Sequence, residues 1–198
     1  MASDKKIVGL SFNSPVILSF TFICFIVLAL DLITAGRTTY TFFSVYRSSF
    51  ANPLTYLRMF SHVLGHANWE HLFGNMTMLL VVGPLLEEKY GSSNTLFVIL
   101  ATALITGLVN FFFFPGVRLL GASGVVFAFI LLSSFTCSQE RKIPITFILV
   151  ALIYIGQQIY SAIFVKDNIS NLAHLLGGGV GSLLGYIMNK NKMYRTSY

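Results

Sequence analysis

The stretch that decides the fold class is PVILSFTFICFIVLALDLITA, residues 15–35. Its one charged side chain, Asp31, lies close to its end. About 20 consecutive apolar residues are what an α-helix needs to cross the hydrocarbon core of a bilayer, whereas a signal peptide has a shorter apolar core followed by a small-residue cleavage site. We therefore expect a retained first transmembrane helix here.

The composition of the whole chain is that of a membrane protein. Of the 198 residues, 55% are hydrophobic and 10% are charged, whereas a soluble domain carries about 25% charged residues. The two cysteines, Cys24 and Cys137, lie in or at the end of apolar runs, so we interpret them as small apolar residues rather than a disulfide pair. The length predicts a single domain over residues 1–198.

Five further apolar stretches are each close to the length of a membrane-spanning helix. All six must be helical, because lipid offers no partner for bare backbone polar groups. The sequence thus predicts an all-α polytopic membrane protein with a bundle of six transmembrane helices. Aromatic and arginine residues in the long outer loop, residues 36–70, predict short helices at the membrane surface. The further spans are 71–88, 95–114, 121–138, 143–164 and 171–188.

The lysine and arginine residues are unevenly divided between the two sides of the predicted bundle. With the N-terminus inside, the outer segments hold Arg37, Arg47, Arg58, Arg118 and Lys166. The remaining eight lie on the cytoplasmic side, which predicts that both termini are cytoplasmic. The net charge of +6 therefore suits lipid headgroups, and we expect no nucleic-acid partner. The cytoplasmic set is Lys5, Lys6, Lys89, Arg141, Lys142, Lys190, Lys192 and Arg195.

Polar residues lie at the start of three of the predicted spans. The second, fourth and sixth spans run from outside to inside, so their N-terminal ends share the outer half of the membrane. A lone serine in a span is usually explained by a hydrogen bond to a neighbouring helix. Three polar sets at one depth favour a functional site, because polar groups inside a membrane are costly. They are His71 and Asn75, Ser123, and Asn171 and His174.

These side chains have the chemistry of acyl transfer. The Ser123 hydroxyl becomes a nucleophile when a neutral histidine such as His174 takes its proton. His71 and Asn75 are four residues apart on one helix face and can donate hydrogen bonds to an oxyanion. The free backbone N–H of Ser123, at its helix start, adds a further donor. No acidic residue has a spacing that ties it to His174, so we expect a Ser–His dyad.

Glycines surround both members of this pair. Gly121 and Gly124 flank Ser123 and leave room for another backbone or a substrate. Glycine rows of four-residue spacing form close-packing faces between membrane helices. If such a row meets the glycines beside Ser123, His174 comes within hydrogen-bonding reach of the serine. The row that follows His174 is Gly177, Gly181 and Gly185.

Three motifs together resemble the rhomboid family of intramembrane serine proteases: His71-Leu-Phe-Gly-Asn75, Gly121-Ala-Ser123-Gly124 and Ala173-His174-Leu-Leu-Gly177. The resemblance implies a minimal six-span prokaryotic form in the inner or plasma membrane. It implies Ser123 as nucleophile, His174 as general base, and His71, Asn75 and the Ser123 N–H as oxyanion site. The substrates would be transmembrane segments of other membrane proteins, cut near the outer face through an acyl-enzyme, without a cofactor.

Other residues acquire roles only through this resemblance. Tyr56-Leu-Arg58 looks like the aromatic-x-Arg element of the family's first outer loop, and Glu87 looks like its structural carboxylate. Substrate would reach the site past residues 161–170. The chain departs from many bacterial relatives by having Phe127 where they carry a tyrosine stacked on the catalytic histidine. The i, i+4 spacing still places this ring on the Ser123 face.

Three other interpretations compete with a protease. His62, His66 and His71 invite a metal site, but the glutamate of an HExxH zinc site is lacking, and we expect no metal. A non-catalytic rhomboid-like protein that binds transmembrane clients would usually lack the serine or the histidine. A small transporter would place charged residues near the middle of the membrane, and Gln157 and Gln158 are the best indication for one.

Overall fold

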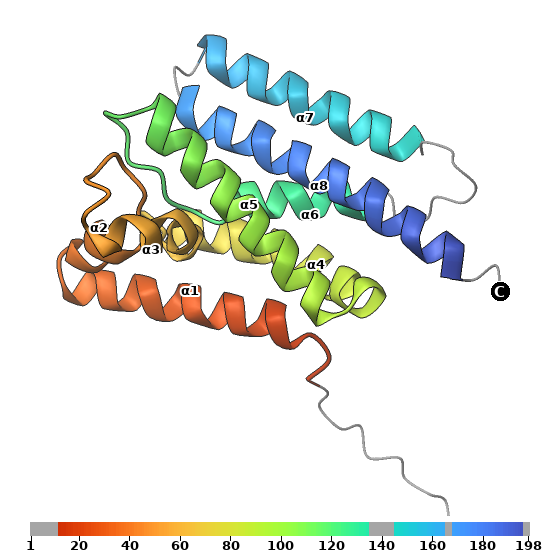
Figure 1. Cartoon of the computed structure of the whole chain (residues 1–198), viewed down its shortest axis with the longest axis horizontal. Coiled ribbons are helices and arrows are strands. Elements are labelled where there is room, and N and C mark those ends of the chain that lie inside the picture. Colours follow the sequence, from red (N-terminus) through yellow and green to blue (C-terminus); the bar gives the residue numbers. More distant parts are fainter. Residues whose placement is uncertain (1–11, 135–144, 165–167, 196–198) are drawn as a thin grey trace, which may run out of the picture.

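The computed structural model describes residues 12–134, 145–164 and 168–195, although the side chains of 154–155, 157–159, 161–164, 168–173 and 189–195 lie outside this description. The described residues form helices and no strand, so the predicted all-α class is confirmed (Figure 1). A long helix overlaps each predicted span: α1 (Pro15–Ile33), α4 (Trp69–Tyr90), α5 (Ser92–Phe113), α6 (Ser123–Ser134), α7 (Ile145–Phe164) and α8 (Asn168–Arg195).

The helices carry the apolar surface of a membrane protein. In length and hydropathy, α1 and α5 are each sufficient to cross a bilayer, and α6 is a shorter apolar helix. The predicted fourth span extends to residue 138, and residues 135–144 lie outside the described part of the chain. Large apolar side chains that are more than 60% exposed occur on five of the described helices, a surface that soluble proteins avoid; they include Phe22, Leu85, Phe113, Ile153 and Leu183.

The long outer loop folds into short helices, as predicted. They are α2 (Arg37–Phe42), α3 (Pro53–Ser61) and the 3₁₀ turn η1 (His62–Leu64). The start of α3 is fixed by Asn52, whose side-chain oxygen accepts a hydrogen bond from the Leu54 N–H at 3.0 Å. A proline in the first turn completes a favourable helix start, because its missing N–H is not needed there.

Arg58 ties α3 to the rest of the loop. Its side chain is buried, and its Nε donates a 2.7 Å hydrogen bond to the Thr41 carbonyl. Its guanidinium also lies 4.5 Å from the centre of the Tyr46 ring. A buried arginine with both a carbonyl and an aromatic partner stabilises a loop through charge-assisted bonding and cation–π contact. Arg58 therefore has a structural position, away from the site residues.

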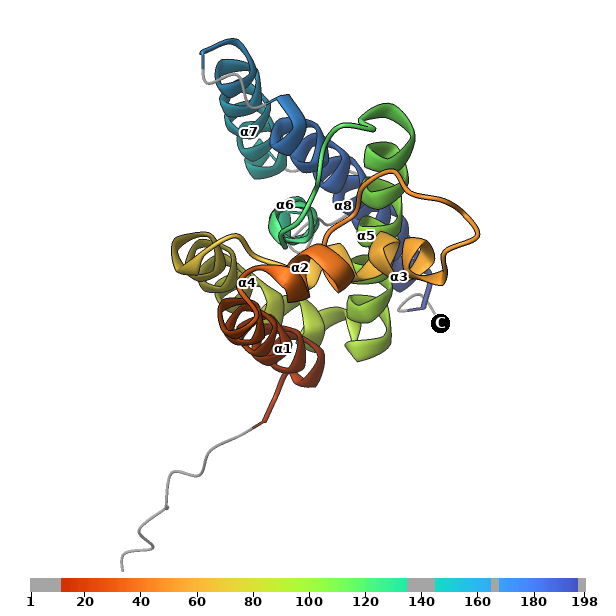
Figure 2. The same ribbon diagram turned by 90° about the vertical axis from the view of Figure 1, so that its left-hand side faces the viewer.

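The helix that begins at Ser123 lies at the centre of the bundle. α6 packs against α4, α5, α7 and α8, and its contact with α8 is the most extensive. Figure 2 shows α6 nearly end-on, with α7 at the edge of the molecule. The buried apolar face of α6 joins the main core, so the position of Ser123 is fixed by packing on several sides. This face includes Val125, Ala128, Phe129 and Leu132.

Near the C-terminal end of α4, Glu87 joins this helix to the starts of α1 and α5. Its carboxylate accepts hydrogen bonds from the backbone N–H groups of Val16 and Ile17, both at 3.0 Å, and from the Ser92 hydroxyl at 2.7 Å. The side chain is 3% exposed. A carboxylate at a helix N-terminus satisfies free N–H groups and complements the helix dipole. Glu87 thus connects the start of α1 to the α4–α5 junction.

Candidate functional site

The first wall of the site is a backbone-to-backbone contact between α6 and α8. A Cβ atom added to Gly177 would lie 2.1 Å from the Gly124 carbonyl oxygen, and one added to Gly181 would lie 2.1 Å from that of Ala128. Only glycine lets two helices approach this closely. The predicted meeting of the two glycine sets is therefore present in the structure. It brings the first turn of α6 beside the His174 end of α8.

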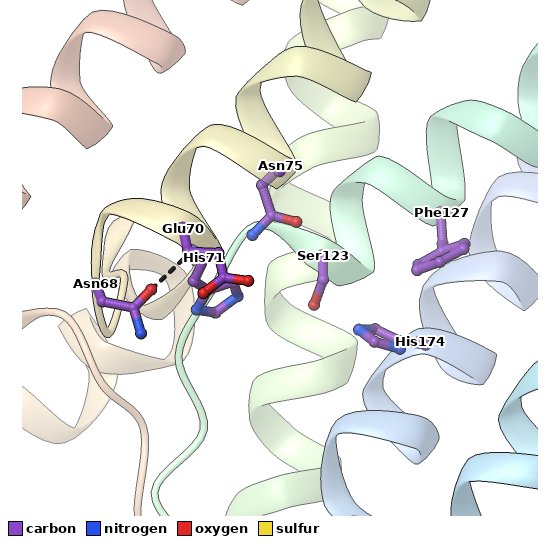
Figure 3. Close-up of a pocket in the computed structure, with 8 residues that line it drawn as sticks. Asn68, Glu70, His71, Asn75, Ser123, Phe127 and His174 are labelled. Carbon is purple, nitrogen blue, oxygen red and sulfur yellow. Dashed lines mark hydrogen bonds between the residues drawn. The ribbon is translucent and has the colours of Figure 1, made fainter.

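Ser123 and His174 face one another across this contact. Ser123 is the first residue of α6 and is half-buried. Figure 3 shows its hydroxyl pointing toward the imidazole of His174. One turn further along α6, the Phe127 ring lies with its centroid 4.8 Å from that of His174, at an interplanar angle of 47°. The ring thus contacts the imidazole as a tilted pair rather than as a parallel stack.

The second wall is the N-terminal part of α4. The helix begins two residues before the predicted position, because the Asn68 side chain caps it and accepts a 2.8 Å hydrogen bond from the His71 N–H. Asn75 follows one turn after His71 and is 8% exposed. Its amide Nδ2 has no hydrogen-bond partner in the described part of the chain, and it points toward the site (Figure 3). Such a buried donor is available to a bound acceptor.

Gly121 connects the two walls. Its φ of +119° is a conformation that residues with a side chain rarely adopt. A Cβ atom there would also lie 2.7 Å from the His71 ring. Its N–H donates a 3.0 Å hydrogen bond to the His62 carbonyl in the outer loop. Glycine is thus required for conformation and for space at the segment that leads into Ser123.

The outer loop is hydrogen-bonded to this same segment. Val45 and Leu119 exchange backbone hydrogen bonds of 2.9 and 3.0 Å. Asn110, buried in α5, donates from Nδ2 to the carbonyls of Val45 and Val117 at 3.1 and 3.2 Å. Asn110 was not among the residues predicted from the sequence. The available signal was an amide side chain within the apolar stretch 95–114, where polar residues usually have a specific partner.

The loop histidines have structural partners. His62 is buried between the Thr106 hydroxyl, 3.2 Å from Nε2, and the Arg58 carbonyl, 3.2 Å from Nδ1. The His66 ring meets the His71 ring edge-on at 5.1 Å. Burial lowers the pKa of both His62 and His66 to about 4, so both are neutral near pH 7. Over the described ranges, no three metal-ligating side chains are grouped to hold an ion.

The two walls line an open cavity of about 490 Å³. It contains the nucleophile, base and donor candidates named from the sequence, and it adds residues that the sequence analysis did not single out: Asn68, Glu70 and Gly74. Their position in the sequence was the signal, since each lies within one turn of His71 or Asn75, at the start of α4 or just before it. The side chains of Gln157 and Gln158 and those of residues 161–170 lie outside the described part of the chain. The lining residues are Asn68, Glu70, His71, Gly74, Asn75, Ser123, Phe127 and His174.

Comparison with known proteins shows which family the chain resembles. The family model described as rhomboid domain matches residues 53–191. Rhomboid-related protein 2 of Mus musculus is 31% identical over 155 residues, which are 68% of this chain and 51% of that protein. Rhomboid protease GlpG of Haemophilus influenzae is 28% identical over 136 residues, 67% of this chain and 70% of that protein.

A plant relative extends the comparison. Rhomboid-like protein 11, chloroplastic, of Arabidopsis thaliana is 26% identical over 139 residues, 63% of this chain and 50% of that protein. The match thus spans about half the length of the mouse and plant relatives. The family model covers most of the chain and includes both walls of the cavity. The chain therefore belongs to the rhomboid family of integral membrane proteins.

Proposed function

We propose that the protein is an intramembrane serine protease that cleaves transmembrane segments of other membrane proteins near their outer ends. The observation that carries this proposal is the cavity in which the Ser123 hydroxyl faces His174 while the amide Nδ2 of Asn75, which has no partner among the described residues, points into the same space. Nucleophile, base and oxyanion donor are the minimum set for acyl transfer. Membership of a family that includes a relative named a protease supports it.

The reaction follows from these positions. His174 removes the proton of the Ser123 hydroxyl as its oxygen attacks the scissile carbonyl. The Asn75 amide, His71 and the Ser123 backbone N–H stabilise the negative oxygen of the tetrahedral intermediate. His174 then protonates the leaving amine, and an acyl-enzyme ester remains on Ser123. Water, deprotonated by His174, hydrolyses this ester and restores the serine. No cofactor takes part.

The proposal includes a topology. The chain would form one membrane domain over residues 1–198, with six spans and both termini in the cytoplasm of a prokaryotic cell. The helices that overlap the predicted ranges and the apolar outer surface support this arrangement. In it, the cavity lies in the outer half of the inner or plasma membrane. Substrates would reach it from the surrounding lipid.

The test is cleavage of a transmembrane substrate by the purified full-length protein in liposomes. We expect Ser123→Ala and His174→Ala to lower the rate by at least about 10³-fold, because removing either member of a catalytic pair removes most of the catalysis. The matched control is Ser134→Ala. This serine lies at the other end of α6, and its hydroxyl bonds to the Ile130 carbonyl at 3.3 Å. Cleavage that persists in Ser123→Ala would overturn the assignment.

A fluorophosphonate probe gives a test that needs no substrate. It should label the wild-type protein on Ser123 and leave Ser123→Ala unlabelled. Labelling should also fall in His174→Ala, because the hydroxyl loses its base. A wild-type protein that is not labelled would contradict the protease proposal and favour a client-binding member of the family.

A further inference from the structure

The cavity contains a carboxylate that the proposed mechanism does not use. Glu70 lies in the first turn of α4, and no other acidic side chain is among the described residues that line the cavity. Figure 3 shows Glu70 on the α4 side of Ser123, with His174 on the other side. The carboxylate is therefore not placed to orient His174 as a third triad member would. The structure gives it no cationic partner among the described residues.

Stabilisation of the helix does not fully explain why Glu70 lines the cavity. An acidic residue in the first turn of a helix stabilises the helix dipole by about 0.3–1 kcal/mol. That effect needs negative charge near the N-terminus and does not need a side chain directed at the cavity.

Gly74 provides space next to this carboxylate. It lies four residues after Glu70, on the same helix face and about 6 Å further along the axis. A Cβ atom at Gly74 would meet no atom of the described residues within 4 Å, so the wall of the cavity is open there. An extended lysine or arginine side chain has the length to lie across Gly74 and end at Glu70. The neighbouring stripe of the same helix carries His71 and Asn75.

We propose that Glu70 and Gly74 form a subsite for a basic residue beside the scissile bond of the substrate. This inference rests on the proposed function. The Asn75 side chain is more than nine-tenths buried, and its Nδ2 has no hydrogen-bond partner among the described residues, so it marks where a substrate carbonyl binds. The side chain of an adjoining residue then lies over Gly74 with its charged group against Glu70. The same carboxylate repels an acidic residue at that position, which adds to the discrimination.

The test measures binding, so that it does not depend on catalysis. Transmembrane peptides that differ only by lysine, glutamine or glutamate, placed in turn at each position of the outer half, are titrated against the full-length Ser123→Ala protein in liposomes. At one position we expect lysine to give a Kd about fivefold to tenfold lower than glutamine. Glu70→Gln should reduce this ratio to about one. Glu88→Gln, which alters an exposed glutamate at the other end of α4, should leave the ratio unchanged.

Two further variants separate the two parts of the subsite. Glu70→Lys should shift the preference to the glutamate peptide at the same position. Gly74→Leu should remove the lysine preference while Glu70 remains. The proposal is overturned if no position shows a lysine preference, or if the lysine-to-glutamine ratio survives Glu70→Gln. A wild-type protein that cleaves no peptide while the Ser123→Ala protein keeps the Kd ratio would disprove the protease and support the subsite.

Discussion

The two sides of Ser123 are fixed by different kinds of contact. Toward α8, the helices meet backbone to backbone at Gly177 and Gly124, with no room for a single added carbon. Toward the outer loop, the segment before Ser123 is joined through hydrogen bonds to the His62 carbonyl, to Val45 and to Asn110. The first contact depends on shape and the second on polar groups.

This difference predicts how mutations on each side should affect the activity. Two rigid backbones in contact have no rotamer to adjust, so an added atom must move a whole helix. A group of hydrogen bonds loses one member while the others remain, and each is worth about 1 kcal/mol net. Damage on the α8 side should therefore abolish activity sharply, and damage on the loop side should reduce it in steps.

Gly177→Ala tests the shape-dependent side and should have the largest effect. The added methyl group overlaps the Gly124 carbonyl, so α8 must move and carry His174 away from Ser123. A displacement of about 1 Å can cost 10²-fold in rate, and we expect a loss of at least about 100-fold in cleavage. Initial rates in liposomes and thermal unfolding measure the effect.

Gly179→Ala is the control for this change, because nothing lies within 4 Å of an added Cβ there. It should keep full activity and be slightly more stable, since alanine is favoured over glycine in a helix by about 0.5–1 kcal/mol. If Gly177→Ala is as active as Gly179→Ala, the close contact does not position the dyad.

Gly121→Ala tests the point at which the two sides meet. The substitution is strained at a φ of +119° and places a methyl group against the His71 ring. Such backbone strain costs on the order of 1–3 kcal/mol, and we expect kcat to fall about 10- to 100-fold as His71 moves. Gly116→Ala, in the same loop but with open space around it, should be unaffected. Equal rates for both variants would show that His71 position is not critical.

Asn110→Leu tests the hydrogen-bonded side and should have a smaller effect. It removes the bonds to Val45 and Val117, but the backbone pair of Val45 and Leu119 remains. We expect the free energy of unfolding to fall by about 1–3 kcal/mol and activity to fall a few-fold. The control is Asn94→Leu, an exposed asparagine near the other end of α5. A loss as large as that of Gly177→Ala would show that both sides fail in the same way.

The structural features that could be predicted from the sequence are those that leave a regular pattern in it. Apolar runs long enough to cross a bilayer gave the positions of the long helices, and the four-residue glycine spacing gave the face of α8 that meets α6. Polar residues at three helix starts predicted one shared cavity, because alternate spans begin on the same side. The first two patterns each lie within one helix, and the third needs only the order and direction of the spans.

The sequence could not predict contacts between a side chain and a distant backbone. Asn110 and Val45 are 65 residues apart, and Glu87 bonds to N–H groups at the start of α1 about as far away. A backbone partner can be any residue type, so such a bond leaves no signature in the sequence. The early start of α4 was missed for a related reason. It depends on the Asn68 cap, which hydropathy does not detect, and it includes Glu70 in the first turn of the helix.

Acidification should destabilise the loop side. The pKa of His62 and of His66 is lowered from an unfolded value near 6.5 to about 4, so folding favours their neutral forms. Their contribution to stability is complete above pH 6.5 and is lost as the pH falls from 6.5 toward 4. The melting temperature in detergent should decline over that window, and His62→Gln should flatten part of the decline. A melting temperature constant from pH 7 to 4.5 would contradict the neutral burial of these rings.

Phe127 should have a modest effect on the rate, because it contacts His174 without fixing the distance between helices. Phe127→Leu loses an aromatic pair worth about 0.5–1.5 kcal/mol, so kcat should fall about threefold to tenfold. Phe127→Tyr keeps the ring and should stay within about twofold of wild type. The pH–rate profile and kcat of both variants provide the measurement. If Phe127→Leu is as fast as Phe127→Tyr, the ring only fills space, and the orientation of His174 comes from the glycine contact between α8 and α6.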